Sequence, residues 1–237
     1  MVNIEELKKE LQKLSDPERA KNLQRFFKTG KGEYGEGDIF IGLTVPQMRE
    51  VSKKYYNYDI KQLQELMNSK IHEYRMIALF ILINKYKKTQ HQKIITHFYL
   101  KNAGKGNINN WDLIDLSAPN ILGTQFLENK KDRKILYKLA KSQSLWEKRI
   151  SILATFMFIK YNDFKDSLSI AEILLNDKHD LIHKAVGWML REIGKRNLEE
   201  EEKFLKKHYK KMPRTMLRYA IEKFPEEKRK AYLNGKI

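Results

Sequence analysis

Residues 180–196, DLIHKAVGWMLREIGKR, give the clearest evidence of the fold. Drawn as an α-helix, this stretch separates an apolar stripe from a basic stripe that also holds an indole. The basic stripe consists of Lys184, Trp188, Arg191 and Lys195, and the opposite, apolar stripe of Val186, Leu190 and Ile193. A helix with this pattern buries one face against other helices and leaves the other face to solvent or a ligand.

Similar helices follow one another at intervals of 38, 36, 35 and 32 residues. We expect the second members of successive helix pairs to begin near Glu73, Trp111, Glu147, Ile182 and Arg214. Paired helices with a loose period in the thirties are typical of α-solenoids, whose stacked pairs leave a concave face built from the second helices. The chain has only 11 glycines and 5 prolines in 237 residues, which also favours helices. The sequence therefore predicts one all-α repeat domain over residues 1–237.

The N-terminal part is predicted to differ from the repeats. Residues 3–14 form a first helix capped by Asn3, and an Asp-Pro-Glu start launches a second helix that stops at Gly30. The segment 29–40, TGKGEYGEGDIF, has the glycine spacing of a dinucleotide fingerprint, but no strand precedes it and two glutamates would repel a phosphate. We therefore expect a flexible surface loop, followed by a turn and a helix within residues 40–55.

The charge balance indicates a polyanionic partner. The chain carries 47 Lys and Arg against 30 Asp and Glu, a formal net charge of +17. Nucleic acid is the leading partner class, because an anionic membrane surface would call for a clustered basic helix and here the basic residues run through the whole chain. No uncharged run approaches the length of a membrane span. The absence of cysteine excludes disulfides, thiolate zinc sites and cysteine nucleophiles, and it favours a cytoplasmic, intracellular setting.

Residues 107–122, NINNWDLIDLSAPNIL, hold the main candidate for chemistry. In a helix, Trp111 and Asp115 share one face, whereas Leu113 points away from it. A carboxylate beside an aromatic surface in a basic protein suits the stabilisation of a cation next to a bound polyanion. The alternative is an exposed aspartate near a helix start with a half-buried tryptophan. Asp112 lies about 100° round the helix from Trp111, and we expect it to support the helix N-terminus.

Basic side chains beside aromatic ones recur in the other predicted second helices, including residues 145–161. If the pairs stack in register, the residues lining one groove are Arg75, Trp111, Asp115, Arg149, Trp188, Arg191 and Arg218. A solvated face would explain any one of these basic residues alone, so the inference depends on their recurrence. His179 and His183 resemble a zinc-binding helix, but no third ligand follows at a suitable spacing. We expect no metal there, and a helix cap from His179 or Asp180.

Four motifs, taken in order, resemble one known family. They are Phe40-x-Gly42-x-x-x-Pro46-x-x-Arg49, Trp111-Asp112-x-x-Asp115, Trp146-x-x-Arg149, and Lys184-Ala-Val-Gly187-Trp188-Met-Leu-Arg191-Glu192. This combination resembles the AlkD-type DNA alkylation repair family from about residue 20 to the end of the chain. Members are DNA glycosylases built from HEAT-like repeats. The resemblance therefore implies a right-handed solenoid of HEAT-like antiparallel helix pairs with a concave basic groove.

The same resemblance implies roles for individual residues. Asp115 would be the catalytic carboxylate, Trp111 and Trp188 the aromatic walls beside the lesion nucleotide's backbone, and Arg149 a phosphate anchor. The other DNA contacts would come from Arg191, Lys184, Arg75, Arg218, Arg49, Thr44 and Phe26. Phe26 and Thr44 stand where the family pattern would have Tyr and Gln, which affects contact with the base pair and the substrate range. No metal or other cofactor is implied.

The resemblance thus implies a DNA glycosylase that removes cationic N3- or N7-alkylated purines from duplex DNA, in base excision repair, and we expect it to act as a monomer. An alkylated purine is already positively charged, so a single carboxylate suffices in principle to stabilise the oxocarbenium-like sugar and to orient water. The alternative is a non-catalytic HEAT-like scaffold that binds structured or damaged DNA or RNA. A protein-binding solenoid is a third possibility, and the net charge of +17 disfavours it.

Overall fold

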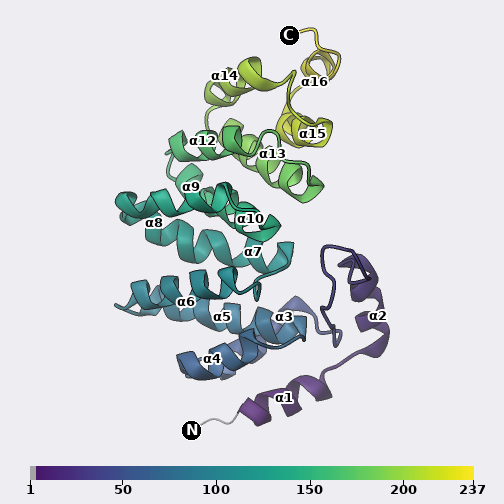
Figure 1. Ribbon diagram of the computed structural model, residues 1–237, viewed down its shortest axis with the longest axis vertical. Helices are drawn as coiled ribbons and strands as arrows, with labels where there is room; N and C mark the ends of the chain where they lie inside the picture. The colour runs from purple at the N-terminus through teal and green to yellow at the C-terminus, as the bar shows by residue number, and fades with distance from the viewer. Residues whose placement is uncertain (1–3) are drawn as a thin grey trace. The chain divides into compact units, whose positions relative to one another are not determined.

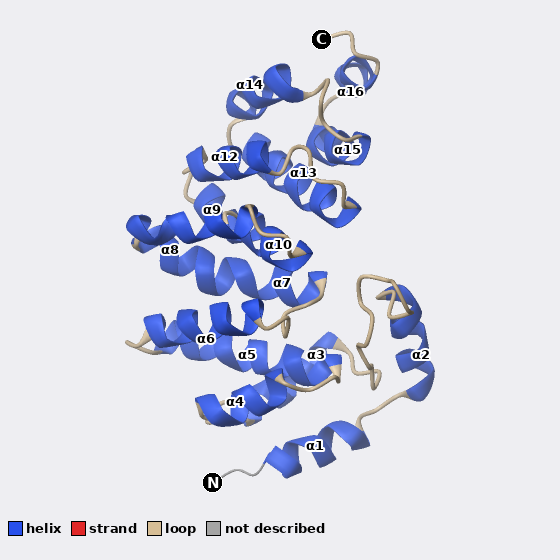
Figure 2. Ribbon diagram, in the orientation of Figure 1, coloured by secondary structure: helices blue, strands red, loops and turns tan. Residues whose placement is uncertain are grey.

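The computed structural model describes residues 4–237, and helices account for its regular structure throughout that range (Figures 1 and 2). Among these residues there is no strand, and an isolated β-bridge joins Ile39 to Ile71. The predicted all-α fold is confirmed. The chain divides into two compact units, Met1–Leu113 and Ile114–Ile237. A single domain, a right-handed superhelix and a concave groove each involve both units, and they stay predictions.

The first unit contains six complete helices among its described residues. They are α1 (Ile4–Lys13), α2 (Pro17–Phe26), α3 (Val45–Lys54), α4 (Ile60–Met67), α5 (His72–Lys88) and α6 (Gln92–Gly104), followed by the start of α7 (Trp111–Ala118). The predicted cap Asn3 lies outside the described residues. Asp16 caps α2 through the backbone N–H of Arg19, as predicted, but α2 ends at Phe26 and not at Gly30. Thr44 and Gln47 form a capping box that starts α3.

Helix α5 is the core of the first unit. Every residue from His72 to Ile83 is buried, and α3, α4 and α6 all pack against this helix. The prediction that Arg75 lines a groove does not fit this burial. The buried turns of α5 have no solvent face, so their few charged side chains must find partners inside the protein.

The segment 29–40 is not a simple surface loop. Gly35 is buried, and a Cβ at this position would lie 2.4 Å from the carbonyl oxygen of Phe27. Directly after this segment, the buried carboxylate of Glu73 accepts hydrogen bonds from the backbone N–H groups of residues 41–43. The expected surface location therefore fails for Gly35, Asp38 and Phe40, which are buried, whereas Glu36, Gly37 and Ile39 are exposed. At Gly35 the absence of a Cβ allows the close packing of the backbone.

The second unit is a series of helix pairs. Its helices after α7 are α8 (Thr124–Glu128), α9 (Lys134–Ala140), α10 (Leu145–Ala154), α11 (Phe156–Lys160), α12 (Lys165–Ile173), α13 (Asp180–Gly194), α14 (Leu198–His208), α15 (Arg214–Ala220) and α16 (Glu226–Leu233). The second helices α5, α7, α10, α13 and α15 begin within two residues of the predicted positions. The predicted continuous helix 145–161 is interrupted at Thr155, whose hydroxyl bonds the carbonyl of Ile152.

Helix α13 lies at the centre of the second unit. It packs against α10, α12, α14 and α15, and Figure 1 shows it between α10 and α15. A Cβ at Gly187 would lie 2.4 Å from the carbonyl oxygen of Met216, so glycine lets α13 and α15 approach closely. Val186, Leu190 and Ile193 are buried, which confirms the predicted apolar stripe. None of the described helices is long and apolar enough to span a membrane.

Candidate functional site

A cluster of packed rings supports Trp111 in the first unit. The imidazole of His72 stacks on Phe40 with ring centroids 4.5 Å apart, and its centroid lies 5.3 Å from that of Phe27. Phe27 stacks on Phe40 at 4.9 Å and on the indole of Trp111 at 5.2 Å. Phe26 meets the same indole edge-on at 6.0 Å and is 63% exposed. In this ring cluster, Phe27 therefore connects a buried imidazole to a half-buried indole beside an exposed phenyl ring.

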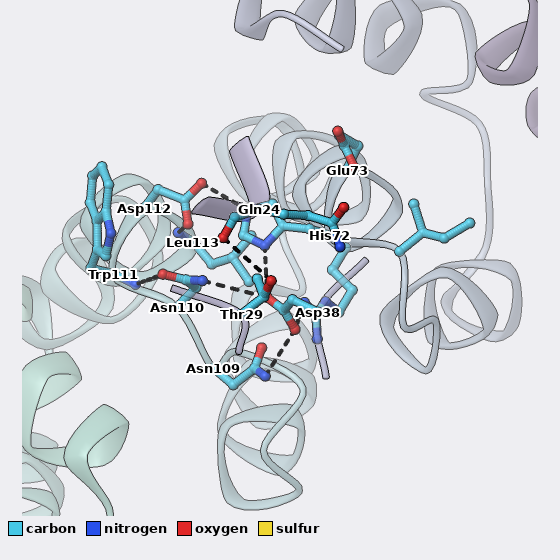
Figure 3. A network of polar contacts seen from close by, with 12 residues as sticks. Gln24, Thr29, Asp38, His72, Glu73, Asn109, Asn110, Trp111, Asp112 and Leu113 are labelled. Atoms are coloured by element: carbon cyan, nitrogen blue, oxygen red, sulfur yellow. Dashed lines mark hydrogen bonds and ion pairs between the residues drawn. The ribbon is translucent and has the colours of Figure 1, made fainter. Parts of the chain in front are cut away.

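Asp38 is the centre of a buried polar network that shares His72 with the ring cluster (Figure 3). Its carboxylate accepts hydrogen bonds from Arg75, at 2.6 Å, and from His72 Nδ1, at 3.1 Å. The side-chain amides of Asn109 and Asn110 reach the same carboxylate at 3.2 and 3.5 Å. The interactions with Arg75 and His72 hold the pKa of Asp38 below its usual value although burial opposes ionisation.

The network continues to the residues on both sides of Trp111. The side chain of Asn110 accepts the backbone N–H of Trp111 at 2.9 Å. Asp112 accepts the backbone N–H of Leu113 at 2.8 Å, which confirms that it supports the helix start. Its other carboxylate oxygen lies 2.8 Å from His72 Nε2, a contact that the sequence did not indicate.

In the second unit, Asp115 is held by a buried arginine. Arg149 donates from Nε to one carboxylate oxygen at 2.9 Å and from Nη2 to the other at 2.7 Å, and Nη1 donates to the carbonyl of Leu181 at 2.6 Å. The Arg149 side chain is 5% exposed, whereas that of Asp115 is 20% exposed. The phosphate contact predicted for Arg149 does not fit this burial. Its guanidinium instead fixes the orientation of a carboxylate that solvent can reach.

The predicted basic stripe of α13 is half-buried and partly neutralised. The ring centroids of Trp188 and Phe156 lie 5.9 Å apart. The indole N–H of Trp188 donates a hydrogen bond to the carboxylate of Glu192 at 3.1 Å. Arg191 pairs with Glu222, and Lys184 pairs with Asp180 at 2.6 Å. On α15, Arg218 is exposed, and no ion pair is found for it within the described residues. Arg218 therefore offers a cationic side chain that a phosphate can reach.

The remaining predicted contacts lie in the first unit. Arg49 is exposed, with its guanidinium carbon 4.5 Å from the ring centroid of Phe80. The side chain of Thr44 is engaged in capping α3. Arg75 is 5% exposed and paired with Asp38, so the phosphate contact predicted for Arg75 does not fit the structure.

The predicted helix cap at His179 is confirmed, because its Nδ1 accepts the backbone N–H of Leu181 at 3.1 Å. Across residues 4–237, no group of three or more His, Cys, Asp or Glu side chains is placed to hold a metal ion.

Sequence reasoning missed Asp38 and His72. They lie 34 residues apart in the sequence, and His72 and Asp112 lie 40 apart, so no helical spacing relates them. One signal was present. The polar sequence of residues 72–75, HEYR, directly precedes the apolar run of residues 76–83, MIALFILI. Charged residues at the start of so apolar a helix are expected to be buried and paired.

Comparison with known proteins gives a family and a fold. The sequence matches the family model for DNA alkylation repair enzymes over residues 7–224. No curated protein matches the chain. Among solved structures, a predicted DNA alkylation repair enzyme from Enterococcus faecalis aligns with a TM-score of 0.71 at 15% identity, covering 90% of this chain and 97% of that one.

Two Streptococcus mutans structures align less closely. AlkD2 has a TM-score of 0.57 at 18% identity and covers 89% of this chain and 99% of its own. The protein smu.31 has a TM-score of 0.56 at 20% identity and covers 88% of this chain and 98% of its own. At such identities these similarities show the helical fold and nothing further.

Proposed function

The chain belongs to the family of DNA alkylation repair enzymes, and we propose that it is a DNA glycosylase acting on cationic N3- or N7-alkylated purines in duplex DNA. The observation that carries this proposal is the Asp115 carboxylate. Two charge-assisted hydrogen bonds from a buried arginine orient it, and it is still 20% exposed. A fixed negative charge that solvent can reach suits a reaction in which positive charge develops on a sugar and water attacks.

The chemistry requires few protein groups. A purine alkylated at N3 or N7 carries a positive charge, so it leaves as a neutral base without receiving a proton. As the glycosidic bond breaks, the deoxyribose becomes oxocarbenium-like, and Asp115 stabilises this cation and orients the attacking water. The water adds to the anomeric carbon and releases one proton to solvent. The products are the free alkylated base and an abasic site.

Arg149 acts through Asp115. Asp115 bonds to two N–H groups of one planar guanidinium, so its two oxygens are fixed in position before DNA binds. Preorganised charge of this kind costs no reorganisation when the transition state forms. Arg149 is therefore a positioning residue, and its third bond, to the Leu181 carbonyl, ties it to the start of α13.

Two indoles provide aromatic surface for the proposed reaction, each within its own unit. Trp111 is half-buried and stacks on Phe27 of the ring cluster, and Trp188 is half-buried on α13. The face of an indole carries negative charge density and attracts a cation within about 6 Å. We assign both as surfaces against the backbone of the lesion nucleotide.

The net charge of +17 supports DNA as the partner. Exposed cations such as Arg49 and Arg218, one in each unit, suit contacts with phosphate oxygens. Phe26 is assigned to contact with the base pair, because 63% of its side chain is exposed next to Trp111.

The decisive experiment measures release of free 7-methylguanine from a duplex with one such lesion, at DNA occupancy matched between variants. Asp115→Asn is expected to lower the single-turnover rate on the order of 10²–10³-fold with binding retained. The matched control is Asp163→Asn, because Asp163 also pairs with a buried arginine, Arg133, at 2.8 Å and is 26% exposed. The control should keep the full rate.

Two results would contradict the proposal. Equal loss of activity in Asp115→Asn and Asp163→Asn would point to a general effect of breaking an arginine pair. Saturating, salt-sensitive DNA binding without release of 7-methylguanine or 3-methyladenine by the parent protein would instead favour a non-catalytic nucleic-acid scaffold.

A further inference from the structure

His72 is buried between two carboxylates. Its ring is 2% exposed, Nδ1 lies 3.1 Å from Asp38 and Nε2 lies 2.8 Å from Asp112. An ionised carboxylate only accepts hydrogen bonds, and a neutral imidazole has only one N–H to donate. Both contacts can therefore be hydrogen bonds at once only when the ring is an imidazolium.

The charges around His72 balance in that state. Asp38 and Asp112 are negative, and His72 and Arg75 are positive, with Arg75 bonded to the second oxygen of Asp38 at 2.6 Å. Glu73, the next residue along α5, is occupied by backbone N–H groups of residues 41–43. Burial by itself would lower the pKa of His72, but Asp112 and Asp38 outweigh it and raise this pKa to about 9.

The two carboxylates near His72 are linked to the residues before and after Trp111 in the sequence. Asp112 is the next residue along α7. Asp38 accepts the side-chain amide of Asn110, whose oxygen in turn accepts the backbone N–H of Trp111. The His72 ring also packs against both Phe40 and Phe27 in the ring cluster, and Phe27 stacks on the indole of Trp111. One imidazolium thus supports Trp111 through its backbone and through its ring.

We propose that His72, as an imidazolium bridging Asp38 and Asp112, is a positioning residue that holds Trp111 in place for contact with the lesion strand. The role of Trp111 rests on the proposed function; the bridge and its effect on Trp111 do not. When His72 loses its proton, one carboxylate loses its donor. Asp112 is the one to separate, because its side chain is 17% exposed and can be rehydrated, whereas that of Asp38 is 2% exposed. Trp111 then loses the constraint on its C-terminal side.

The first test does not require catalysis. The imidazole ¹⁵N shifts of the full chain, recorded between pH 6 and 10, should report a doubly protonated His72 at pH 7.5 that titrates near pH 9. In protein labelled with 5-fluorotryptophan, the ¹⁹F resonance of Trp111, identified with Trp111→Phe, should shift over the same pH range. A neutral His72 at pH 7.5, or a Trp111 resonance that does not follow the titration, overturns the proposal.

Variants separate positioning from simple loss of stability. His72→Gln has one amide group in place of two ring N–H groups and is expected to displace the Trp111 resonance at pH 7.5. Asp112→Asn removes the carboxylate that we expect to separate, so the Trp111 resonance should no longer shift near pH 9. The matched control, His97→Gln, lies on the exposed face of α6 and should resemble the parent. A folded His72→Gln protein with an unmoved Trp111 resonance contradicts positioning.

The last measurement joins the bridge to the proposed reaction. In single-turnover excision of 7-methylguanine, His72→Gln should lower the rate by up to about 10²-fold and change DNA affinity little, because misplacing one wall affects the reacting geometry more than binding. The parent rate should fall as pH rises through 9, and the His97→Gln rate should fall with it. If no protein excises the base, the glycosylase proposal fails, whereas the NMR results still decide on the bridge. If excision occurs and His72→Gln is as fast as the parent, the assignment of His72 is wrong.

Discussion

The pair of Arg149 and Asp115 gives the most direct test of the site, through a double-mutant cycle on stability. Asp115→Asn keeps the shape and one acceptor, whereas Arg149→Met keeps the apolar stem and removes all donors. Each single change leaves a partner unsatisfied, and Arg149→Met also leaves the carbonyl of Leu181 without its donor. The double variant removes both charged groups together, so it should cost less than the sum of the single changes.

The magnitude follows from the geometry. Hydrogen bonds to charged groups contribute about 1.5–3 kcal/mol each, and the pair has two, at 2.9 and 2.7 Å. Because the Asp115 side chain is 20% exposed, water screens part of this interaction and compensates the aspartate when arginine is lost. We therefore expect a coupling free energy of about 2 kcal/mol, with the larger single cost, about 3 kcal/mol, for Arg149→Met.

Urea unfolding of the four proteins at pH 7 measures the cycle, with tryptophan fluorescence and circular dichroism as independent probes. A coupling below about 0.5 kcal/mol lies within ordinary additivity and would refute a preorganised carboxylate. The same samples are then assayed for excision. Arg149→Met retains the carboxylate but lets it rotate, so its rate should lie between those of the parent and Asp115→Asn.

Three further predictions concern other parts of the chain. Burial raises the pKa of Glu201 to about 8, so the unfolded chain loses this proton at lower pH than the folded protein does. As pH rises from 5 to 8, the free energy of unfolding of the parent should therefore fall by about 3 kcal/mol relative to that of Glu201→Gln. Urea unfolding at several pH values measures both free energies, and a difference between them that does not change with pH would contradict this. Glu73→Gln should lower the free energy of unfolding by about 2–3 kcal/mol and accelerate amide hydrogen exchange at residues 41–43, whose N–H groups lose a charged acceptor. Unchanged exchange at these residues would show that their N–H groups find other acceptors. Arg218→Met should reduce the slope of the logarithm of the DNA-binding constant against the logarithm of salt concentration by about one. An unchanged slope would show that Arg218 does not contact a DNA phosphate.

The helical framework was accessible from the sequence because its signals are local. The caps Asp16 and His179 lie within three residues of the backbone N–H groups that they satisfy. The apolar stripe of α13 likewise depends only on the period of the helix. For these reasons the starts of the second helices could be predicted to within two residues.

The partners of buried charges could not be predicted in the same way. Arg75 and Arg149 occupy repeated helices, where a basic side chain facing phosphate and one facing a buried carboxylate look alike in sequence. What separates them from the exposed Arg218 is a carboxylate more than thirty residues away, Asp38 for Arg75 and Asp115 for Arg149. The surface location predicted for segment 29–40 fails for a related reason, because nothing in its local sequence shows that Gly35 packs against the backbone carbonyl of Phe27.

The excess positive charge of the chain is therefore not in its core. The most buried cationic side chains are held by carboxylates: Arg75 by Asp38, His72 by Asp38 and Asp112, Arg133 by Asp163 and Asp166, and Arg149 by Asp115. A buried ion without a partner would be costly, so burial selects for pairing. The net charge of +17 must then lie mainly at the surface, where phosphate can reach it. In the proposals made above, buried charge orients Trp111 and Asp115 and surface charge attracts DNA, so the two proposed tasks use different basic residues.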